Sequence, residues 1–453
     1  MGVITLGQAA AWCGGQIDPK YKDVTFLGAN NDTRKLQAGQ LFLALEGARD
    51  GHEFVSAAFE KGAAAVLCKH ADGDYPAIVV EDVRIALGQI AKQERQRLGM
   101  QVVAITGSVG KSTTKEMVYA VLQTTYRTGK TPVNHNNDIG MPMAILALPE
   151  NTQVAVLEMG MNHFGEIAYL ADIAKPDVGI IINIGTMHIE NLGSQEGIMQ
   201  AKLEMLEGLA ENGTMVLNGD DAFLWRNPKV ADIAATYFGM KNASCDLVAK
   251  DITQNEEGMH FVCHTDADSF AVDLALEGAH FVPDAMAAVA AGLALQVQPE
   301  NIQKALRDFR NMEGRQEEYT AYGYTIIKDC YNAGPESMEA ALNVLGNKSG
   351  RRVAVLGDML ELGVCTQAEH YKVGRLAAQK ADILLAYGPN SVRMLNGART
   401  GGMPETRARA FTDRNRLVTV LKQMVKPGDV ILFKGSRGMR MELILERFLQ
   451  TEE

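Results

Sequence analysis

The sequence predicts an α/β protein built from several domains around parallel sheets. Its 453 residues are enough for about three domains of ordinary size. Short apolar runs alternate with helical patterns along most of the chain, which is typical of strand–helix–strand units. A buried strand, a glycine loop and an amphipathic helix also follow one another directly over residues 102–122. These three observations favour a doubly wound α/β architecture.

The composition is that of a globular protein and excludes several classes of function. Apolar residues make up 47% of the chain, but the longest strongly apolar run, 285–295, is too short to cross a bilayer. The first residues show no signal-peptide pattern and the six cysteines form no CxxC pair, so we expect a reduced, cytoplasmic location, no membrane insertion and no structural zinc. The net charge of −11 argues against nucleic acid as the main partner.

Residues 1–98 predict a small mixed α/β domain. The expected strands cover 24–28, 40–45, 63–67 and 77–81, and a helical pattern closes the unit from Val83 to Leu98. Asp32, Thr33 and Arg34 lie in a loop that follows a strand. Such a loop could hold a pyrimidine edge and a diphosphate, because arginine binds phosphate through two N–H groups. A solvated turn is the competing interpretation of the same residues.

A glycine loop opens the second predicted domain, which covers residues 99–313. Gly107 and Gly110 bracket a tight turn between the apolar strand and a helix that begins at Lys111. A helix N-terminus points unpaired N–H groups at an anion, and the glycines let the backbone approach closely. Lys111 can reach the outer phosphates, and Ser112 supplies a hydroxyl for magnesium. The loop therefore favours a P-loop-type nucleotide-binding domain, although its short GxxGK[ST] form is also compatible with an ordinary strand-to-helix turn.

Two polar features follow the glycine loop. The segment 134–142 carries many side-chain amides, which could bind a polar ligand or cap the following helix. Glu158 ends the apolar strand 154–158. Ligands bind at the carboxyl edge of a parallel sheet, so we expect Glu158 to hold magnesium beside the phosphate loop. An exposed loop acid is the alternative interpretation.

Lys202 lies inside the apolar stripe of a helix expected over residues 194–209. The apolar positions of that stripe are Ile198, Met199, Met205, Leu206 and Leu209. A buried lysine is costly unless it is paired or modified, and burial lowers its pKa and leaves a neutral amine. Such an amine can add carbon dioxide to form a carbamate, which is an anionic ligand for magnesium. A lysine that pairs with Glu158 or a phosphate, or that extends to the edge of the helix, is equally compatible with this spacing.

Residues 314–453 predict a second doubly wound domain of Rossmann-like type. Its expected strands cover 324–329, 351–357, 381–388 and 429–435, and its expected helices cover 335–345, 367–379, 414–424 and 439–449. Three polar loops, 329–335, 357–363 and 434–438, each follow a strand. They should therefore share one sheet edge and form a wall of a cleft that faces the nucleotide domain.

Taken together, these residues make the chain similar to the Mur ligases of peptidoglycan synthesis over essentially its whole length. The motifs that carry the resemblance are TGSVGKSTTKEM, NHNNDIGMP, EMGMNHFGEI, NIGTMHIENLGSQEGIMQAKLEM, MEGRQE, DCYNAGPESMEAAL, VLGDMLELG and FKGSRGMRME. The segment with Asp358 and Glu361 resembles the members that add a dipeptide, and a DNPR-type motif is not found. The chain departs from the family near residue 280, where Phe281 and Asp284 replace the asparagines of an HNxxN-like pattern used around adenine.

The resemblance implies a role for each matching position. Ser112 and Glu158 would hold one magnesium ion, and His188 with a carbamylated Lys202 would hold a second. The implied catalytic residues are Lys111, His188, Lys202 and Arg315. The implied nucleotide-binding residues are Gly107, Ser108, Gly110, Lys111, Ser112, Thr113, Asn136, Arg315 and Asp329. The implied substrate-binding residues are Asp32, Thr33, Arg34, Asn137, Asn332 and Asp358.

The activity that the resemblance implies is an ATP-dependent, ADP-forming amide ligation. It would join D-alanyl-D-alanine to UDP-N-acetylmuramoyl-tripeptide through an acyl phosphate, with residues 1–98 binding the uridine diphosphate. We expect ATP, two Mg²⁺ ions and these two substrates as ligands, and a monomeric chain. A folylpolyglutamate synthetase and a nucleotide-gated binding protein without ligase activity are the alternatives. The sequence leaves open whether the third peptide residue is diaminopimelate or lysine.

Overall fold

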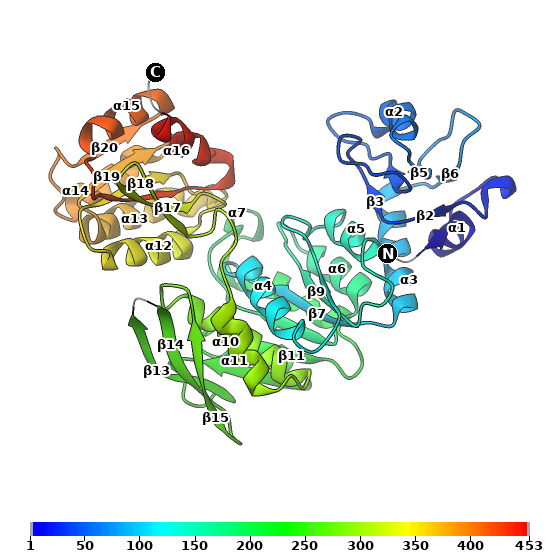
Figure 1. The fold of residues 1–453 in the computed structure, drawn as a ribbon, viewed down its shortest axis with the longest axis horizontal. Coiled ribbons are helices and arrows are strands. Elements are labelled where there is room, and N and C mark those ends of the chain that lie inside the picture. Colours follow the sequence, from blue (N-terminus) through cyan, green and yellow to red (C-terminus); the bar gives the residue numbers. More distant parts are fainter. Residues whose placement is uncertain (1–2, 256, 451–453) are drawn as a thin grey trace.

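The structure is a computed structural model that describes residues 3–255 and 257–450. Figure 1 shows three lobes, with the central lobe between an N-terminal lobe in blue and a C-terminal lobe in yellow to red. Each lobe has a predominantly parallel sheet, and helices pack on its faces. The three-domain α/β fold expected from the sequence is confirmed. No helix of the described residues is both long and apolar enough to span a membrane.

The N-terminal lobe has a four-stranded parallel sheet in the order β3-β4-β5-β6 and a separate β1–β2 pair. Its helix α3 covers the residues expected to be helical and ends at Gly99 in a left-handed conformation, which glycine adopts without strain. The elements are β1 (Ile4–Thr5), α1 (Leu6–Cys13), β2 (Thr25–Phe26), β3 (Ala29–Asn30), β4 (Leu41–Leu43), α2 (Val55–Glu60), β5 (Ala65–Cys68), β6 (Ala77–Val79) and α3 (Val83–Leu98).

The central lobe has a nine-stranded sheet in the order β15-β14-β13-β12-β11-β10-β7-β9-β8. Its first part contains β7 (Gln101–Thr106), α4 (Lys111–Leu122), β8 (Thr128–Lys130), α5 (Gly140–Leu146), β9 (Val154–Glu158), α6 (Glu166–Ala174) and β10 (Val178–Ile181). It continues with α7 (Ile189–Leu192), α8 (Gln195–Leu203), α9 (Met205–Gly208), β11 (Thr214–Asn218), β12 (Ala235–Gly239), β13 (Leu247–Asn255), β14 (Gly258–His264), β15 (Ser269–Leu274), α10 (Phe281–Ala294) and α11 (Pro299–Asp308). Strand β7 lies between β10 and β9, so the phosphate loop leaves the middle of the parallel region.

The C-terminal lobe has a six-stranded sheet in the order β16-β17-β21-β18-β19-β20. Its elements are β16 (Glu317–Ala321), β17 (Tyr324–Asp329), α12 (Pro335–Asn347), β18 (Arg352–Gly357), α13 (Thr366–Lys380), β19 (Ile383–Tyr387), α14 (Ser391–Thr400), β20 (Ala408–Phe411), α15 (Arg414–Met424), β21 (Val430–Lys434) and α16 (Glu442–Leu449). Strands β17, β21 and β18 are parallel neighbours, so the three polar loops that follow them share one edge, as predicted.

The structure corrects the sequence prediction for one helix and adds elements that were not predicted. The single helix expected over 194–209 is divided into α8 and α9 at Glu204, whose carboxylate accepts hydrogen bonds from the Gly165 and Ala168 N–H groups at the start of α6. Strands β16 and β20 and helix α14 were not predicted, because their short segments mix charged and apolar residues without a clear period.

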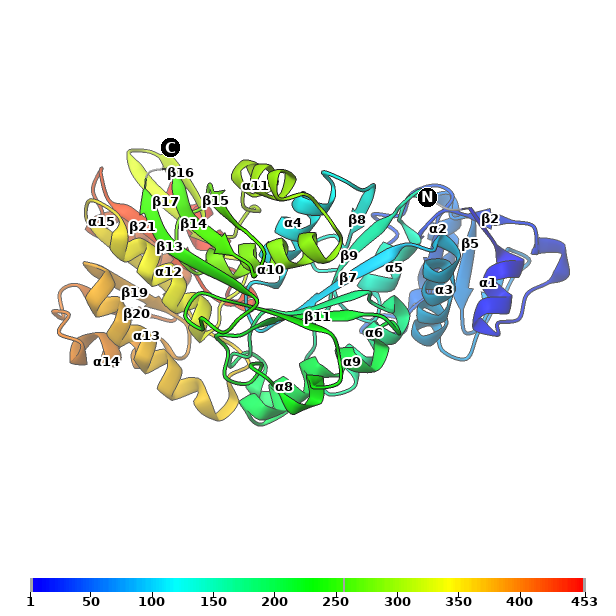
Figure 2. The same cartoon turned by 90° about the horizontal axis from the view of Figure 1, so that it is seen from below.

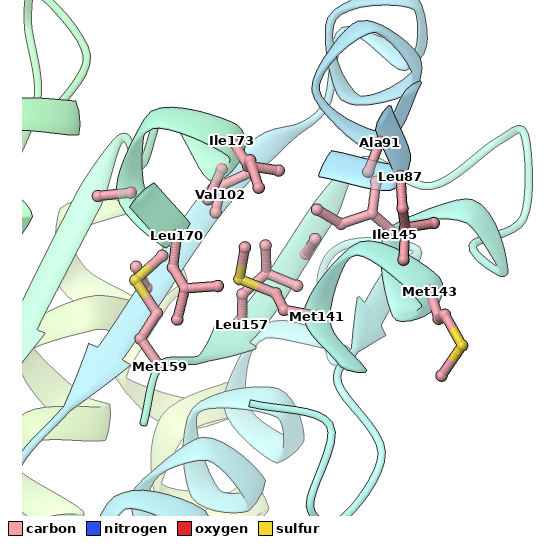
Figure 3. Packing of buried hydrophobic residues seen from close by; sticks show 14 of the residues in the cluster. Leu87, Ala91, Val102, Met141, Met143, Ile145, Leu157, Met159, Leu170 and Ile173 are labelled. Carbon is pink, nitrogen blue, oxygen red and sulfur yellow. The ribbon is translucent and has the colours of Figure 1, made fainter. Parts of the chain in front are cut away.

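The N-terminal and central lobes share one apolar core. Figure 3 shows Leu87 and Ala91 of α3 facing Met141 and Ile145 of α5, while Ile173 of α6 lies on the other side of the cluster. All of these side chains are buried. Figure 2 shows α3 lying against the central lobe, whereas the buried clusters of the C-terminal lobe contain only residues of that lobe.

Candidate active site

One large cleft lies where the three lobes meet. It has a volume of about 1000 Å³. Residues of all three lobes line it, from Asp82 in the first lobe to Arg437 in the third. The phosphate loop and the carboxyl end of β9 form its floor, and the loop after β17 forms the facing wall. This is the arrangement expected for ligand binding at the carboxyl edges of two parallel sheets.

The phosphate loop is held in place before any ligand binds. The Asn183 carboxamide oxygen accepts hydrogen bonds of 3.0 Å from the Ser108 and Val109 N–H groups, and its Nδ2 donates to the Val109 carbonyl. Ser108 Oγ accepts from the Gly185 N–H at 2.8 Å. Lys111 Nζ folds over the loop and donates to the carbonyl oxygen of Gly107 at 2.7 Å. Burial lowers the pKa of Lys111, so this amine gains most when an anionic phosphate arrives.

Glycine is required at position 110 by two local constraints. Its φ of +85° is in the left-handed region, and a Cβ there would lie 2.4 Å from Oδ1 of Asp284. Asp284 in α10 is buried and accepts a 2.9 Å hydrogen bond from the Thr114 hydroxyl. Burial raises the pKa of Asp284 to about 8, with Thr114 and Arg315 opposing the shift. A neutral carboxyl at this position therefore supports the phosphate loop from behind.

Ser112, Glu158 and Asn136 converge beside the loop. Ser112 Oγ donates to Glu158 Oε2 at 2.8 Å, and Asn136 Nδ2 donates to Glu158 Oε1 at 2.9 Å. Glu158 is buried at the end of β9, as its place in the sequence predicted. A hydroxyl and a carboxylate at the mouth of a phosphate loop are hard oxygen donors of the kind that Mg²⁺ prefers, so these residues fit the ion.

Arg315 reaches this cluster from the far side of the cleft. Its Nη2 donates to Ser112 Oγ at 2.9 Å, and its guanidinium carbon lies 4.0 Å from the centroid of the Tyr331 ring. The Tyr331 hydroxyl donates in turn to Asn134 Oδ1. A cation from the C-terminal segment therefore already lies at the phosphate loop, where transferred negative charge would gather.

Lys202 is buried in α8, and its side chain makes no hydrogen bond or ion pair with another of the described residues. Burial lowers its pKa well below the ordinary value, and the neighbouring charge of Lys111 lowers it further. The alternative in which Lys202 pairs with Glu158 is therefore not what the structure shows. The lowered pKa favours the neutral form of this amine, which lies close to Lys111.

His188, the other residue expected at the second magnesium site, lines the same cleft and contacts the C-terminal lobe. Its Nδ1 lies 2.7 Å from Glu361 Oε2 of the C-terminal lobe, and no hydrogen bond joins it to Lys202 in the described part of the chain. The described residues contain no group of three His, Cys, Asp or Glu side chains arranged for a metal. A magnesium site here would depend on the serine hydroxyl, a modified lysine and ligand oxygens.

Asp329 and Asn332, on the C-terminal wall, both line the cleft. Asp329 Oδ2 accepts from Lys434 Nζ at 2.6 Å, and Asn332 Oδ1 accepts from the Ala333 N–H at 2.9 Å. Asp358 differs, because it is fully buried and its Oδ2 accepts two 2.9 Å hydrogen bonds from Asn390. These bonds lie within one lobe, so the geometry gives Asp358 a part in shaping the loop rather than direct access to substrate.

Asp32, Thr33 and Arg34 lie on a loop of the N-terminal lobe, apart from the described lining of the cleft. The Arg34 side chain donates to both carboxylate oxygens of Asp32, at 2.9 and 2.8 Å, and is largely exposed. Asn137 Oδ1 accepts from the Gly140 N–H at the start of α5 at 2.8 Å, and Asn137 also lines the cleft.

Three residues of the site were missed from the sequence. Asn183 braces the phosphate loop, Tyr331 stacks on Arg315, and Glu336 Oε1 accepts from the Thr186 N–H and hydroxyl at 2.8 and 3.1 Å. Asn183 carried a usable signal, because it is a polar residue directly after the apolar run of β10. The other two act across the lobe boundary and left no local signal.

The fold and the cleft define a class of multidomain nucleotide-binding proteins. In this class the phosphate loop of one domain lies opposite the sheet of a second domain across the cleft. Models of the Mur ligase family match three stretches: the catalytic domain model at residues 24–95, the middle domain at 105–292 and the glutamate ligase domain at 314–437.

The chain is 41% identical over 443 residues to UDP-N-acetylmuramoyl-tripeptide–D-alanyl-D-alanine ligase of Bacillus subtilis (strain 168), covering 96% of this chain and 95% of that protein. It superposes on the crystal structure of MurF from Acinetobacter baumannii with a TM-score of 0.92 at 33% identity and full coverage of both chains. MurF ligase from Thermotoga maritima in complex with ADP gives a TM-score of 0.80 at 28% identity, covering 93% and 97% of the two chains. The chain belongs to the Mur ligase family.

Proposed function

We propose that this chain joins D-alanyl-D-alanine to UDP-N-acetylmuramoyl-tripeptide, with conversion of ATP to ADP and phosphate. The full-length similarity to relatives that carry this name supports the choice of substrates. The observation that carries the chemistry is the meeting of Ser112, Glu158 and Arg315 at the phosphate loop, from two lobes that face each other across one cleft.

Activation of the peptide carboxylate requires that two negative groups approach each other. Like unit charges 4 Å apart repel by about 4 kcal/mol at an effective dielectric of 20. Lys111 and Arg315 supply two cations where the γ-phosphate would lie, and they would offset this repulsion as the phosphoryl group moves to the carboxylate. The amine of the dipeptide then attacks the acyl phosphate, forms the amide bond and releases phosphate.

Magnesium would supply further charge neutralisation when it is bound. Ser112 and Glu158 would hold one ion, and His188 with a carbamylated Lys202 would hold a second. The low pKa of Lys202 supports the carbamate, because only a neutral amine adds carbon dioxide. Enriched ¹³CO₂ should give a slowly exchanging carbamate signal in NMR that Lys202→Met lacks. The same signal in both proteins would contradict the assignment.

Water must be kept from the acyl phosphate, because hydrolysis would waste it. The facing loops after β17 and β21 form the wall that can do this when substrates fill the cleft. Asp329 and Lys434 stabilise that wall through their 2.6 Å ion pair.

A coupled assay of ADP release tests the function. ADP should appear only when the tripeptide nucleotide, the dipeptide and ATP are all present, and Lys111→Ala should abolish it. Turnover with a free amino acid in place of the dipeptide would indicate a sister ligase, and nucleotide binding without ADP release would indicate a binding protein.

A further inference from the structure

An ion pair between the N-terminal and central lobes faces into the cleft rather than away from it. Arg84 Nη1 lies 2.9 Å from Asp138 Oδ2, and both residues line the cleft. The Arg84 side chain is 48% exposed and that of Asp138 is 39% exposed, so both charges remain accessible to a ligand. Neither side chain contributes to binding ATP or to the phosphate loop in the interactions described above.

The backbone beside Arg84 is firmly positioned, and apolar side chains line the same cleft. Asp82 Oδ1 accepts from the Arg84 N–H at 2.8 Å and so holds the first turn of α3, while the Tyr169 hydroxyl donates to the Arg84 carbonyl at 3.3 Å. Ile85 and Phe164 line the same cleft with about half of their surface exposed, at 53% and 51%. Large apolar side chains left open in a cleft are suited to the methylene groups of a ligand.

A short series of neighbouring residues links the pair to the phosphate loop. Asp138 is two residues after Asn136, so their Cα atoms are at most about 7 Å apart. Asn136 contacts Glu158, and Glu158 contacts Ser112 at the phosphate loop. If the acceptor carboxylate is activated beside Ser112, as the proposed function requires, the side chain of that same peptide residue can extend past Asn136 to Asp138 and Arg84.

The chemistry of the pair fits one class of side chain. A guanidinium binds a carboxylate through two parallel N–H groups, and a carboxylate accepts hydrogen bonds from an ammonium group. We propose that Arg84 and Asp138 recognise a third peptide residue whose side chain ends in a zwitterionic amino-acid group, as in diaminopimelate, in preference to one that ends in ammonium alone, as in lysine. This inference depends on the proposed function and names the substrate class that the sequence left open.

The competing explanation is a clamp that only joins two lobes. Helix α3 offers a matched example, because Lys92 Nζ lies 2.7 Å from Asp172 Oδ2 across the same lobe boundary but outside the lining of the cleft. Both pairs are partly exposed, so each contributes little to stability by itself. A clamp and a recognition pair therefore differ in substrate preference rather than in stability.

The experiment compares Arg84→Ala, Lys92→Ala and the unaltered chain in the ADP assay with two tripeptide nucleotides, one with diaminopimelate and one with lysine as third residue. Arg84→Ala should lower kcat/KM for the diaminopimelate substrate about 10- to 100-fold, as expected for loss of a charge-assisted contact. It should leave the lysine substrate unchanged or improve it, because the repelling cation is gone. Lys92→Ala should change neither value.

A second variant, Asp138→Asn, tests whether the carboxylate binds the ammonium group of the substrate. It should lower kcat/KM for both nucleotides, because each carries a terminal ammonium group. Arg84→Lys should retain part of the diaminopimelate activity that Arg84→Ala loses. Equal losses for the two nucleotides in Arg84→Ala, or an unaltered chain that prefers the lysine substrate, would overturn the inference while leaving the ligase function intact. No ADP release with either nucleotide in the unaltered chain would instead refute the proposed function.

Discussion

The central lobe contacts its two neighbouring lobes through different kinds of interaction. At the boundary with the N-terminal lobe, Leu87 and Ala91 of α3 are fully buried in a core cluster that continues into α5 and α6 (Figure 3). At the boundary with the C-terminal lobe, no buried apolar cluster of the described residues spans the two lobes. Polar contacts join them instead: Arg315 with Ser112, Glu336 with Thr186, and Lys348 with Glu277.

This difference makes the boundary with the N-terminal lobe rigid and the boundary with the C-terminal lobe mobile. Apolar burial is lost as soon as two surfaces part, whereas hydrogen bonds and ion pairs can be exchanged for water or for ligand at little net cost. We therefore infer that the first two lobes behave as one rigid body and that the C-terminal lobe moves against it during the reaction cycle. Arg315 already contacts Ser112 at the phosphate loop, so the movement would close the polar loops of the third lobe over the rest of the cleft.

The largest expected effect is on the apolar boundary. Leu87→Ala should lower the free energy of unfolding by about 2 to 5 kcal/mol, because it leaves a cavity between α3 and α5. Calorimetry should show the loss in a transition that the N-terminal and central lobes share. Leu432→Ala, in the core of the third lobe, should lower a different transition. A single transition that shifts equally in both variants would contradict the two-body description.

Arg315→Ala tests the polar boundary by its effect on rate. The variant should lose about 10²- to 10³-fold in kcat, the usual result of removing one group that stabilises transferred charge, with an unchanged unfolding midpoint. The matched control is Arg310→Ala, because the Arg310 guanidinium donates, among the residues that the structure describes, only to the carbonyls of Arg307 and Phe309. A stability loss in place of a rate loss would make Arg315 a structural residue.

The buried Asp284 carboxyl should make the stability of the central lobe depend on pH. Its folded-state pKa of about 8 lies above the ordinary 3.8, so between these values the folded chain holds a proton that the unfolded chain has released. Stability from this group is therefore present at low pH and declines as pH rises towards 8. Asp284→Asn should abolish that decline and gain on the order of 4 kcal/mol over the parent at pH 9 relative to pH 5, because about three pH units separate pH 5 from the folded pKa. Parallel stability curves for the two proteins would contradict the assignment.

The smallest effect is expected at Lys348. Its Nζ lies 2.6 Å from both Glu277 of the central lobe and Glu318 of its own lobe, in a partly exposed position. Lys348→Ala should change the free energy of unfolding by less than about 1 kcal/mol but broaden the distribution of lobe separations in small-angle scattering. Lys92→Ala, at the apolar boundary, should leave the scattering unchanged. Broader scattering for Lys92→Ala and unchanged scattering for Lys348→Ala would instead place the flexible joint between the N-terminal and central lobes.

Local patterns in the sequence predicted most of the fold and part of the site. The helix over Val83–Leu98, the strand that ends at Glu158 and the phosphate loop each depend on neighbours within about fifteen residues, so spacing alone revealed them. The burial of Lys202 followed from its place between apolar residues three and four positions away. The interruption of its helix at Glu204 was hidden, because the contact that accompanies it comes from α6.

The sequence by itself determined which segments form strands and helices and which polar groups lie at the carboxyl edges of the sheets, because these properties depend on the local period of apolar residues. Only the tertiary structure decided that Arg315 meets Ser112, that His188 lies against Glu361 and that Arg84 pairs with Asp138. Each of these contacts joins residues more than fifty positions apart and depends on the relative placement of whole lobes. That placement is set by surfaces that no single stretch of the chain contains.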